Sequence, residues 1–269
     1  MNEEKKDGET TQFIKQMDGQ LLGWDQPAER LRDALDHDQF QLEAQPVREL
    51  AGAGGVAFAE VLLRLREEET RTLPPGDFLP AFQHYGMAPE LDRWVLSHAL
   101  TGMSASRSLR RISINVSTQT LDDPGFAEFA AAQLGLAACE PQNLIIEIDE
   151  NDAIDRRAAA ERFAAAMKAA GCRILLDGFA RRSVSFELLE ALHADYVKVD
   201  GTLVRKLLRS AGAVAKLKAI LKVGESTGVG VIAECVEDDR TLASLTLLKV
   251  GYVQGFGVGR PVLLQDLLS

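Results

Sequence analysis

Polar side chains that can bind metal ions stand at the ends of a series of short apolar runs. In chain order they are Glu60, Asn115, Glu147, Asp177, Lys198, Asp200, Glu234 and Gln254. Carboxylate and amide oxygens suit hard cations such as Mg²⁺, Mn²⁺ or Ca²⁺, whereas zinc prefers histidine or cysteine. The four histidines fall in segments that are expected to be helices or loops. The pattern therefore predicts an oxygen-rich site for a hard cation.

A lysine stands within this acidic series. Lys198 and Asp200 are two residues apart in the apolar run YVKVD, so both side chains leave the expected strand on the same face. A lysine among carboxylates could hold a metal-bound water or balance negative charge. The alternative is an interior Lys–Asp pair that only neutralises the inside of the fold.

The apolar runs themselves predict the fold. Near-continuous Val, Ile and Leu runs are typical of strands buried on both faces of a parallel sheet, and the amphipathic segments between them suit crossover helices. Together they predict an α/β fold, a (β/α)8 barrel. The expected helices cover residues 89–103, 123–134, 155–170, 183–192, 211–227 and 238–250, and the first strand covers 40–47. Polar groups at the carboxyl ends of barrel strands point into one mouth, so the site residues should meet there.

Length and composition favour a single domain. The 269 residues fit one barrel of roughly 250 residues. Residues 1–12 are polar and are expected to form a disordered tail, and residues 13–38 a helical lead-in that contains Pro27. Residues 39–269 form the expected barrel.

Charge and cysteine content restrict the class of protein. The net charge of −10 argues against a long basic track for nucleic acid. Cys139, Cys172 and Cys235 are odd in number and far apart, which predicts reduced thiols rather than disulfides or a zinc site. The chain has no apolar run long enough for membrane insertion and does not begin with the apolar core of a signal peptide. A soluble, cytoplasmic protein is expected.

Several of these segments resemble the sequence signature of EAL domains. AEVLLRL is similar to the EALLRW motif, and INVS, IEIDE, KVD, AECVE and QGF follow in the order of the family, with QPV and LDRWVL as further matches. The resemblance runs from about Phe40 to Pro261. It implies a modified TIM-type barrel in a bacterial protein that binds cyclic di-GMP. Active members of the family hydrolyse this second messenger to pGpG with two divalent cations.

The resemblance also implies roles for the matching residues. The first cation would be held by Glu60, Asn115, Glu147 and Asp177, with Asp177 bridging to a second cation served by Glu234. Lys198 would contact the water nucleophile, Asp200 would support the same area, and Glu150 would brace the loop that follows Asp177. The ligand would be bound by Gln45, Glu60, Leu63, Arg64, Asp92, Asn115, Glu237, Gln254 and Phe256. A guanidinium such as that of Arg64 suits a phosphate, and the ring of Phe256 could stack on a base.

The chain departs from the family where active members have DDFGTGYSS. Here the segment reads DGFARRSVS from Asp177, so the second aspartate is Gly178. The departure predicts an impaired second metal site and leaves one Mg²⁺, Mn²⁺ or Ca²⁺ as the expected cofactor. Arg181 and Arg182 could neutralise ligand phosphates, or could simply point to solvent.

Three functions follow from this comparison. The favoured hypothesis is a degenerate EAL domain that acts as a cyclic di-GMP receptor with little or no hydrolysis. The alternatives are an active cyclic di-GMP phosphodiesterase and a protein-interaction module without ligand. A receptor without turnover implies a protein partner, which no motif identifies. The resemblance also implies a homodimer, although no stretch of sequence marks an interface.

Overall fold

The computed structural model describes residues 24, 26–50, 55–67, 71–104, 109–181 and 185–268. The predicted tail at residues 1–12 and residues 13–23 and 25 of the lead-in lie outside this part of the chain, as does Arg182. Within it, helix α2 (Pro27–Asp36) precedes the barrel. No described helix combines the length and the apolar character needed to cross a bilayer.

Eight strands form the closed barrel: β1 (Phe40–Glu49), β2 (Val56–Arg66), β4 (Ile112–Asn115), β5 (Leu144–Asp149), β6 (Arg173–Phe179), β7 (Tyr196–Val199), β8 (Gly230–Ala233) and β9 (Tyr252–Val253). The strands from β2 to β9 pair in parallel, whereas β1 is antiparallel to both β2 and β9 and closes the sheet. Only a few residues join β1 to β2, and so short a connection permits only antiparallel pairing. The α/β barrel prediction is confirmed, with β1 as the modification.

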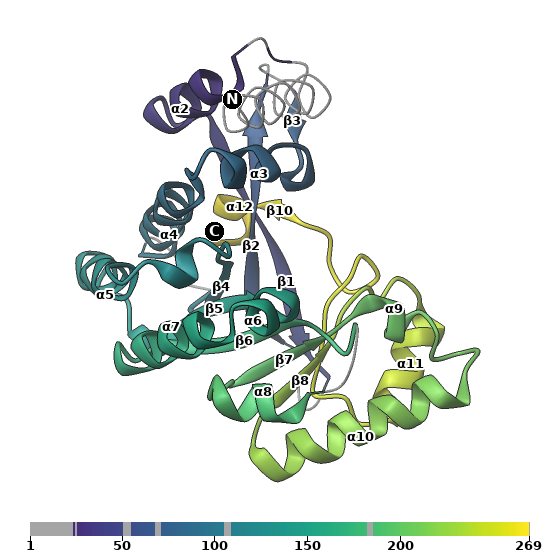
Figure 1. Cartoon of the computed structure of the whole chain (residues 1–269). Helices are drawn as coiled ribbons and strands as arrows, with labels where there is room; N and C mark the ends of the chain where they lie inside the picture. The colour runs from purple at the N-terminus through teal and green to yellow at the C-terminus, as the bar shows by residue number, and fades with distance from the viewer. Residues whose placement is uncertain are drawn as a thin grey trace, which may run out of the picture.

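Two short strands and the helices surround this barrel (Figure 1). Strands β3 (Thr72–Leu73) and β10 (Val262–Leu263) extend the sheet beside β2 and β1. The helices are α3 (Pro75–His84), α4 (Ala88–Ser104), α5 (Phe126–Leu136), α6 (Glu150–Asp155), α7 (Arg157–Ala169), α8 (Phe186–Ala191), α9 (Gly201–Val204), α10 (Ala211–Thr227), α11 (Asp239–Leu247) and α12 (Leu264–Leu268), with 3₁₀ turns η1 (Thr120–Asp122) and η2 (Pro141–Asn143).

Most expected helices are present, and two regions differ for local reasons. The helix expected over 155–170 is present as α7, and a short helix that was not expected, α6, precedes it, because the Asp149 carboxylate caps a helix that starts at Glu150. The helix expected from Asp123 begins instead at Phe126, because the Asp123 side chain accepts a hydrogen bond from Gly125 N in the preceding turn. The expectation for residues 211–227 is confirmed without change.

The inside of the barrel is built in two layers. The lower layer is a buried apolar cluster of Val47, Phe58, Ile145, Leu175, Tyr196 and Ile232, one residue from each of six strands. Since side chains on one face of a strand recur every second residue, the layer above consists of Gln45, Glu60, Glu147, Asp177, Lys198 and Glu234. The apolar floor therefore supports a polar layer at the mouth, made of the residues that the sequence predicts for the site.

Candidate functional site

The ammonium group of Lys198 is the centre of the polar layer. Its Nζ lies 2.6 Å from Glu147 Oε2, 2.8 Å from Glu60 Oε2 and 3.7 Å from Asp177 Oδ1. The four residues come from β7, β5, β2 and β6, and the Lys198 side chain is only 2% exposed. One buried cation thus joins three carboxylates from three other strands.

Two amide side chains complete the surroundings of Glu60. Asn115 Nδ2 donates to Glu60 Oε1 at 2.9 Å, and Gln254 Nε2 donates to Glu60 Oε2 at 2.7 Å. Gln45 lies beside them, with its Oε1 3.4 Å from Gln254 Nε2 and its Nε2 donating to Gly259 O at 2.9 Å. Six of the predicted residues, Gln45, Glu60, Asn115, Glu147, Lys198 and Gln254, therefore form one hydrogen-bonded network, with Asp177 at its edge.

Burial and the mutual repulsion of the carboxylates shift the pKa values in this network. Burial, together with the charge of Glu60, raises the pKa of Glu147 to about 8, and burial also raises the pKa of Asp177. Burial alone would raise the pKa of Glu60, but the charge and hydrogen bond of Lys198 hold it below its ordinary value. Burial opposes the ammonium form of Lys198, yet the three carboxylates raise its pKa well above the ordinary value. Lys198 is therefore a charged donor and not a base.

The donor set of this network fits a hard cation. Among the described residues, Glu147 Oε1 and Asp177 Oδ1 are buried without a hydrogen-bond donor, and such oxygens are costly to leave unpaired. A divalent cation would satisfy both. No three His, Cys, Asp or Glu side chains in the described ranges converge as a ready-made metal cluster, since Lys198 occupies the centre.

The carboxylates of Glu234 and Asp200 already accept hydrogen bonds from other parts of the chain. Glu234 Oε1 accepts from Gly201 N at 2.6 Å, and Asp200 Oδ1 accepts from Thr202 N at 2.9 Å as the cap of α9. Asp200 Oδ2 accepts from Arg181 Nε at 2.8 Å. Arg181 was singled out from the sequence only as one of two arginines beside the mouth, and the replacement of the family's Gly-Thr-Gly loop by Ala180, Arg181 and Arg182 was the signal for it. Asp149, the acid at the end of β5 that contacts the same guanidinium, was missed altogether.

A cavity of about 310 Å³ lies on one side of the mouth. The predicted ligand residues Leu63, Asp92 and Asn115 line it, together with apolar residues of α3 and α4. Asp92 Oδ2 accepts from Ser117 N at 2.8 Å and from Thr120 Oγ1 at 2.6 Å, and burial raises the pKa of Asp92. Asp92 thus also holds the turn that follows β4 against the cavity wall.

The other predicted ligand residues lie elsewhere on the mouth. Arg64 forms an ion pair with Glu43 at 2.8 Å and donates to Leu63 O at 2.9 Å. Phe256 is 56% exposed, and the guanidinium of Arg260 stands 5.0 Å from the centre of its ring. Glu237 is exposed, and its backbone packs against Gly257 in the same loop region as Phe256.

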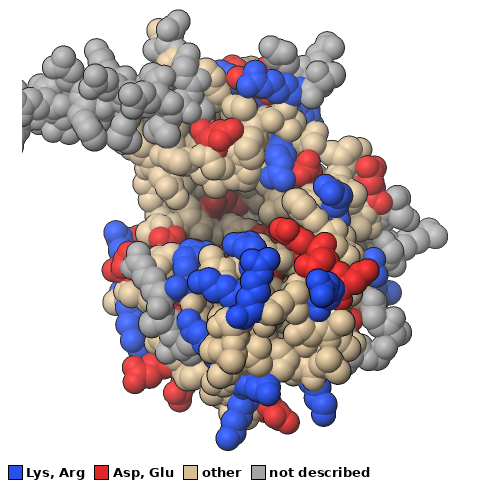
Figure 2. Space-filling model, turned by 90° about the vertical axis from the view of Figure 1, so that its right-hand side faces the viewer, with Lys and Arg blue, Asp and Glu red and all other residues tan. Residues whose placement is uncertain are grey.

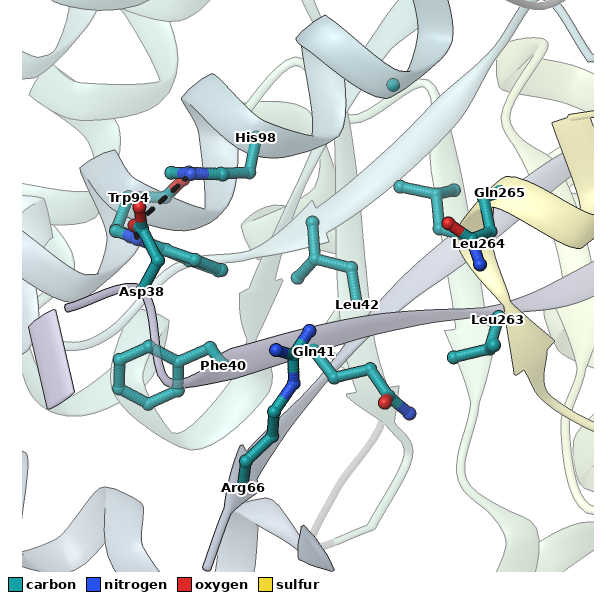
Figure 3. Close-up of a pocket in the computed structure, with 11 residues that line it drawn as sticks. Asp38, Phe40, Gln41, Leu42, Arg66, Trp94, His98, Leu263, Leu264 and Gln265 are labelled. Carbon is teal, nitrogen blue, oxygen red and sulfur yellow. Dashed lines mark hydrogen bonds and ion pairs between the residues drawn. The ribbon is translucent and has the colours of Figure 1, made fainter. Parts of the chain in front are cut away.

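The mouth is visible as a hollow with acidic side chains inside it and Lys and Arg side chains along its lower edge (Figure 2). A larger cavity, of about 710 Å³, is lined by a different set of residues from β1, α4 and the chain end (Figure 3). There the rings of Trp94 and His98 stack at 3.8 Å, and Trp94 Nε1 donates to Asp38 Oδ1 at 2.6 Å. None of the predicted site residues lines this larger cavity, whereas seven of them meet at the mouth, so the mouth is the candidate site.

Comparison with known proteins identifies the family that the chain resembles in fold and in site residues. The profile of the EAL domain family matches residues 28–261. The chain is 32% identical over 237 residues to the cyclic di-GMP phosphodiesterase PdeB of Shewanella oneidensis, covering 87% of this chain and 28% of that protein. It is 29% identical over 243 residues to PdeF of Escherichia coli, a cyclic di-GMP phosphodiesterase, covering 89% and 32%. The chain spans about a third of the length of these relatives.

Solved structures show the same likeness. The PaMucR phosphodiesterase in complex with c-di-GMP is 29% identical, with a TM-score of 0.81 over 90% of this chain and 100% of that one. The FimX EAL domain from Pseudomonas aeruginosa bound to c-di-GMP is 27% identical, with a TM-score of 0.79 over 87% and 96%. Both similar structures therefore hold the same nucleotide.

Proposed function

Because the chain belongs to the EAL domain family, we propose that it binds cyclic di-GMP as a receptor and hydrolyses it little or not at all. Both similar structures described above carry this nucleotide. The mouth offers the matching parts: a cavity beside Leu63 and Asp92, a guanidinium at Arg64 and an exposed ring at Phe256. These features support recognition of two bases and two phosphates.

One cation belongs to this proposal. Glu60, Asn115, Glu147 and Asp177 would hold it. Two of their oxygens, Glu147 Oε1 and Asp177 Oδ1, are buried and accept no hydrogen bond from the residues that the structure describes. When bound, the cation neutralises ligand phosphate and polarises oxygen atoms bonded to it. Lys198, held by Glu60 and Glu147, would orient a ligand or water oxygen as a hydrogen-bond donor.

The proposed loss of hydrolysis rests on the residues at the position expected for a second cation. Two divalent cations about 4 Å apart repel by about 15 kcal/mol at an effective dielectric constant of roughly 20, so a paired site relies on carboxylates that face it. Here position 178 is glycine, and a Cβ there would lie 2.5 Å from Arg181 Nη2. The residues present do not fit a second divalent cation. Without it, charge neutralisation and positioning of the water nucleophile are both weakened.

A receptor without turnover must report its occupancy. We therefore propose a protein partner that distinguishes the free from the occupied mouth. Dimerisation of the chain is part of the same proposal.

Two measurements test the proposal. Calorimetric titration with cyclic di-GMP in Mg²⁺ should give saturable heat, and its absence in Mg²⁺, Mn²⁺ and chelator alike would leave only the protein-interaction module. Incubation with Mn²⁺ followed by chromatography should yield little or no pGpG. A rate similar to that of the PaMucR phosphodiesterase, assayed in parallel, would instead establish an active enzyme.

A further inference from the structure

The side chain of Arg181 bridges two strand ends at the mouth. Its Nε donates to Asp200 Oδ2 at 2.8 Å and its Nη1 donates to Asp149 Oδ2 at 3.1 Å. Asp149 ends β5 and Asp200 follows β7, so the guanidinium spans the end of β6 between them. Each carboxylate uses its other oxygen to cap a helix, through Asn151 N at 2.7 Å and Thr202 N at 2.9 Å. Both acceptors are therefore held by the backbone.

The backbone of β6 makes room for this guanidinium. The pairing of β6 with β7 shifts register between Leu176 and Phe179, and Gly178 within this bulge has a φ of +68°. A Cβ on Gly178 would lie 2.5 Å from Arg181 Nη2 and 2.8 Å from Arg181 Cζ. A side chain at position 178 would therefore require the guanidinium of Arg181 to move.

The residues at the mouth carry an excess of negative charge, which Arg181 partly offsets. Six carboxylates, those of Glu60, Glu147, Asp149, Asp177, Asp200 and Glu234, surround it with the ammonium of Lys198. Even with Glu147 protonated, the carboxylates in this group outnumber its two cations, and the excess negative charge repels an anionic ligand. Lys198 is 2% exposed and Arg181 is 40% exposed, so of these two cations Arg181 is the one that a ligand can reach.

We propose that Arg181 is a built-in cation of the ligand site. Its guanidinium lies between Asp149 and Asp200 and against Gly178, where active members of the family carry an aspartate, so that it excludes a second divalent cation and donates N–H groups to a ligand phosphate. Of its five N–H donors, Asp149 and Asp200 use two, which leaves three within the described part of the chain. A guanidinium matches phosphate oxygens in geometry and in charge. The ligand in this statement rests on the proposed function, whereas the exclusion of the second cation does not.

The first test uses Mn²⁺ alone, so it does not depend on any nucleotide. Calorimetric titration at pH 8 should show one Mn²⁺ bound per wild-type chain. Arg181→Gln should bind two, because Asp149 and Asp200 then face the mouth without their cation. Lys206→Gln is the matched control, since it removes the same charge from an exposed position after α9. Two sites in the wild type, or one site in Arg181→Gln, would overturn the proposal.

The second test uses cyclic di-GMP. At low Mg²⁺, Arg181→Gln should weaken binding by about 10- to 100-fold, the worth of a charge-assisted hydrogen bond, and Lys206→Gln should not. High Mg²⁺ should restore the affinity of Arg181→Gln, because a second cation then supplies the lost charge. Unchanged affinity of Arg181→Gln at low Mg²⁺ would overturn the role of Arg181 in ligand binding.

Two checks separate these outcomes from misfolding and from failure of the proposed function. Melting curves of Arg181→Gln and of Arg181→Lys should match the wild type closely enough to show intact folds, and Arg181→Lys should keep a single Mn²⁺ site. If the wild type binds no cyclic di-GMP, the proposed function fails, and the Mn²⁺ titration still decides whether Arg181 excludes a second divalent cation.

Discussion

Glu147 should make cation binding at the mouth depend on pH between 6 and 8. Burial and the neighbouring charge of Glu60 raise its pKa to about 8 from an ordinary 4.5. A cation binds the carboxylate and not the carboxylic acid, so protons and metal compete for this side chain. Lowering the pH from 8 to 6 is therefore the perturbation of interest.

The expected size of the effect follows from that pKa. At pH 8 about half of the Glu147 carboxyls are ionised, and at pH 6 about one in a hundred. The apparent affinity for Mn²⁺ should then fall about 50-fold, or about 2 kcal/mol of binding free energy. Folding stability changes with pH in the opposite direction to the affinity for Mn²⁺. The folded chain keeps the Glu147 proton to higher pH than the unfolded chain, so without a cation stability falls as the pH rises from about 4.5 to 8.

Calorimetry and thermal melting measure both effects. Mn²⁺ titrations at pH 6 and pH 8 give the affinities, and titrations at pH 7 in buffers of different ionisation heat should show release of about one proton per cation. Melting temperature in chelator should fall from pH 6 to pH 8, and saturating Mn²⁺ should offset the fall. Glu147→Gln is the control, because it keeps the size of the side chain and removes the titration.

The reasoning is refuted if the Mn²⁺ affinity is the same at pH 6 and pH 8 and no proton is released. It is also refuted if Glu147→Gln retains the full pH dependence of Mn²⁺ binding. Either result would place the cation away from Glu147.

Three further variants test other parts of the mouth. Gly178→Asp alone should restore little hydrolysis and should cost about 1–2 kcal/mol of stability, because its φ of +68° disfavours a side chain and Arg181 occupies the space; rapid pGpG formation by this variant would contradict the account. Arg64→Ala should weaken cyclic di-GMP binding about 10- to 100-fold in calorimetry, and an unchanged affinity would mean that the ion pair with Glu43 is its whole role. Lys198→Met should lower the free energy of unfolding by about 3–5 kcal/mol, since buried Glu60 and Glu147 lose their counter-ion. In denaturant titrations, Mg²⁺ should recover part of this loss. A melting curve equal to that of the wild type would show that the carboxylates do not need the ammonium group.

Much of the mouth could be predicted from sequence because strand periodicity is regular. Glu147 follows the floor residue Ile145 by two positions, as Lys198 follows Tyr196, and both pairs can be read from the apolar runs. Such runs also predict that strand ends converge on one mouth. The family signature then adds roles, which residue types alone leave open.

The arrangement of Arg181 could not be predicted in the same way. Its position depends on a register shift in β6, on the positive φ of Gly178 and on the carboxylate of Asp149, which is distant from it in the chain. Without these three features, two arginines in a loop would be expected to be as compatible with pointing to solvent as with pointing into the mouth. Helix α6 was missed for a related reason, because a side-chain cap, and not apolar periodicity, starts it.

The reversed direction of β1 determines where upstream residues leave the domain. Phe40, the first residue of β1, pairs with Leu65 close to the carboxyl end of β2, and α2 immediately precedes it. In a barrel with every strand parallel, the incoming polypeptide would join at the floor, remote from the opening. Here α2 lies at the end of the long β1–β2 pair (Figure 1). The chain therefore enters β1 at the end where the parallel strands terminate, the same end at which Glu147 and Lys198 lie.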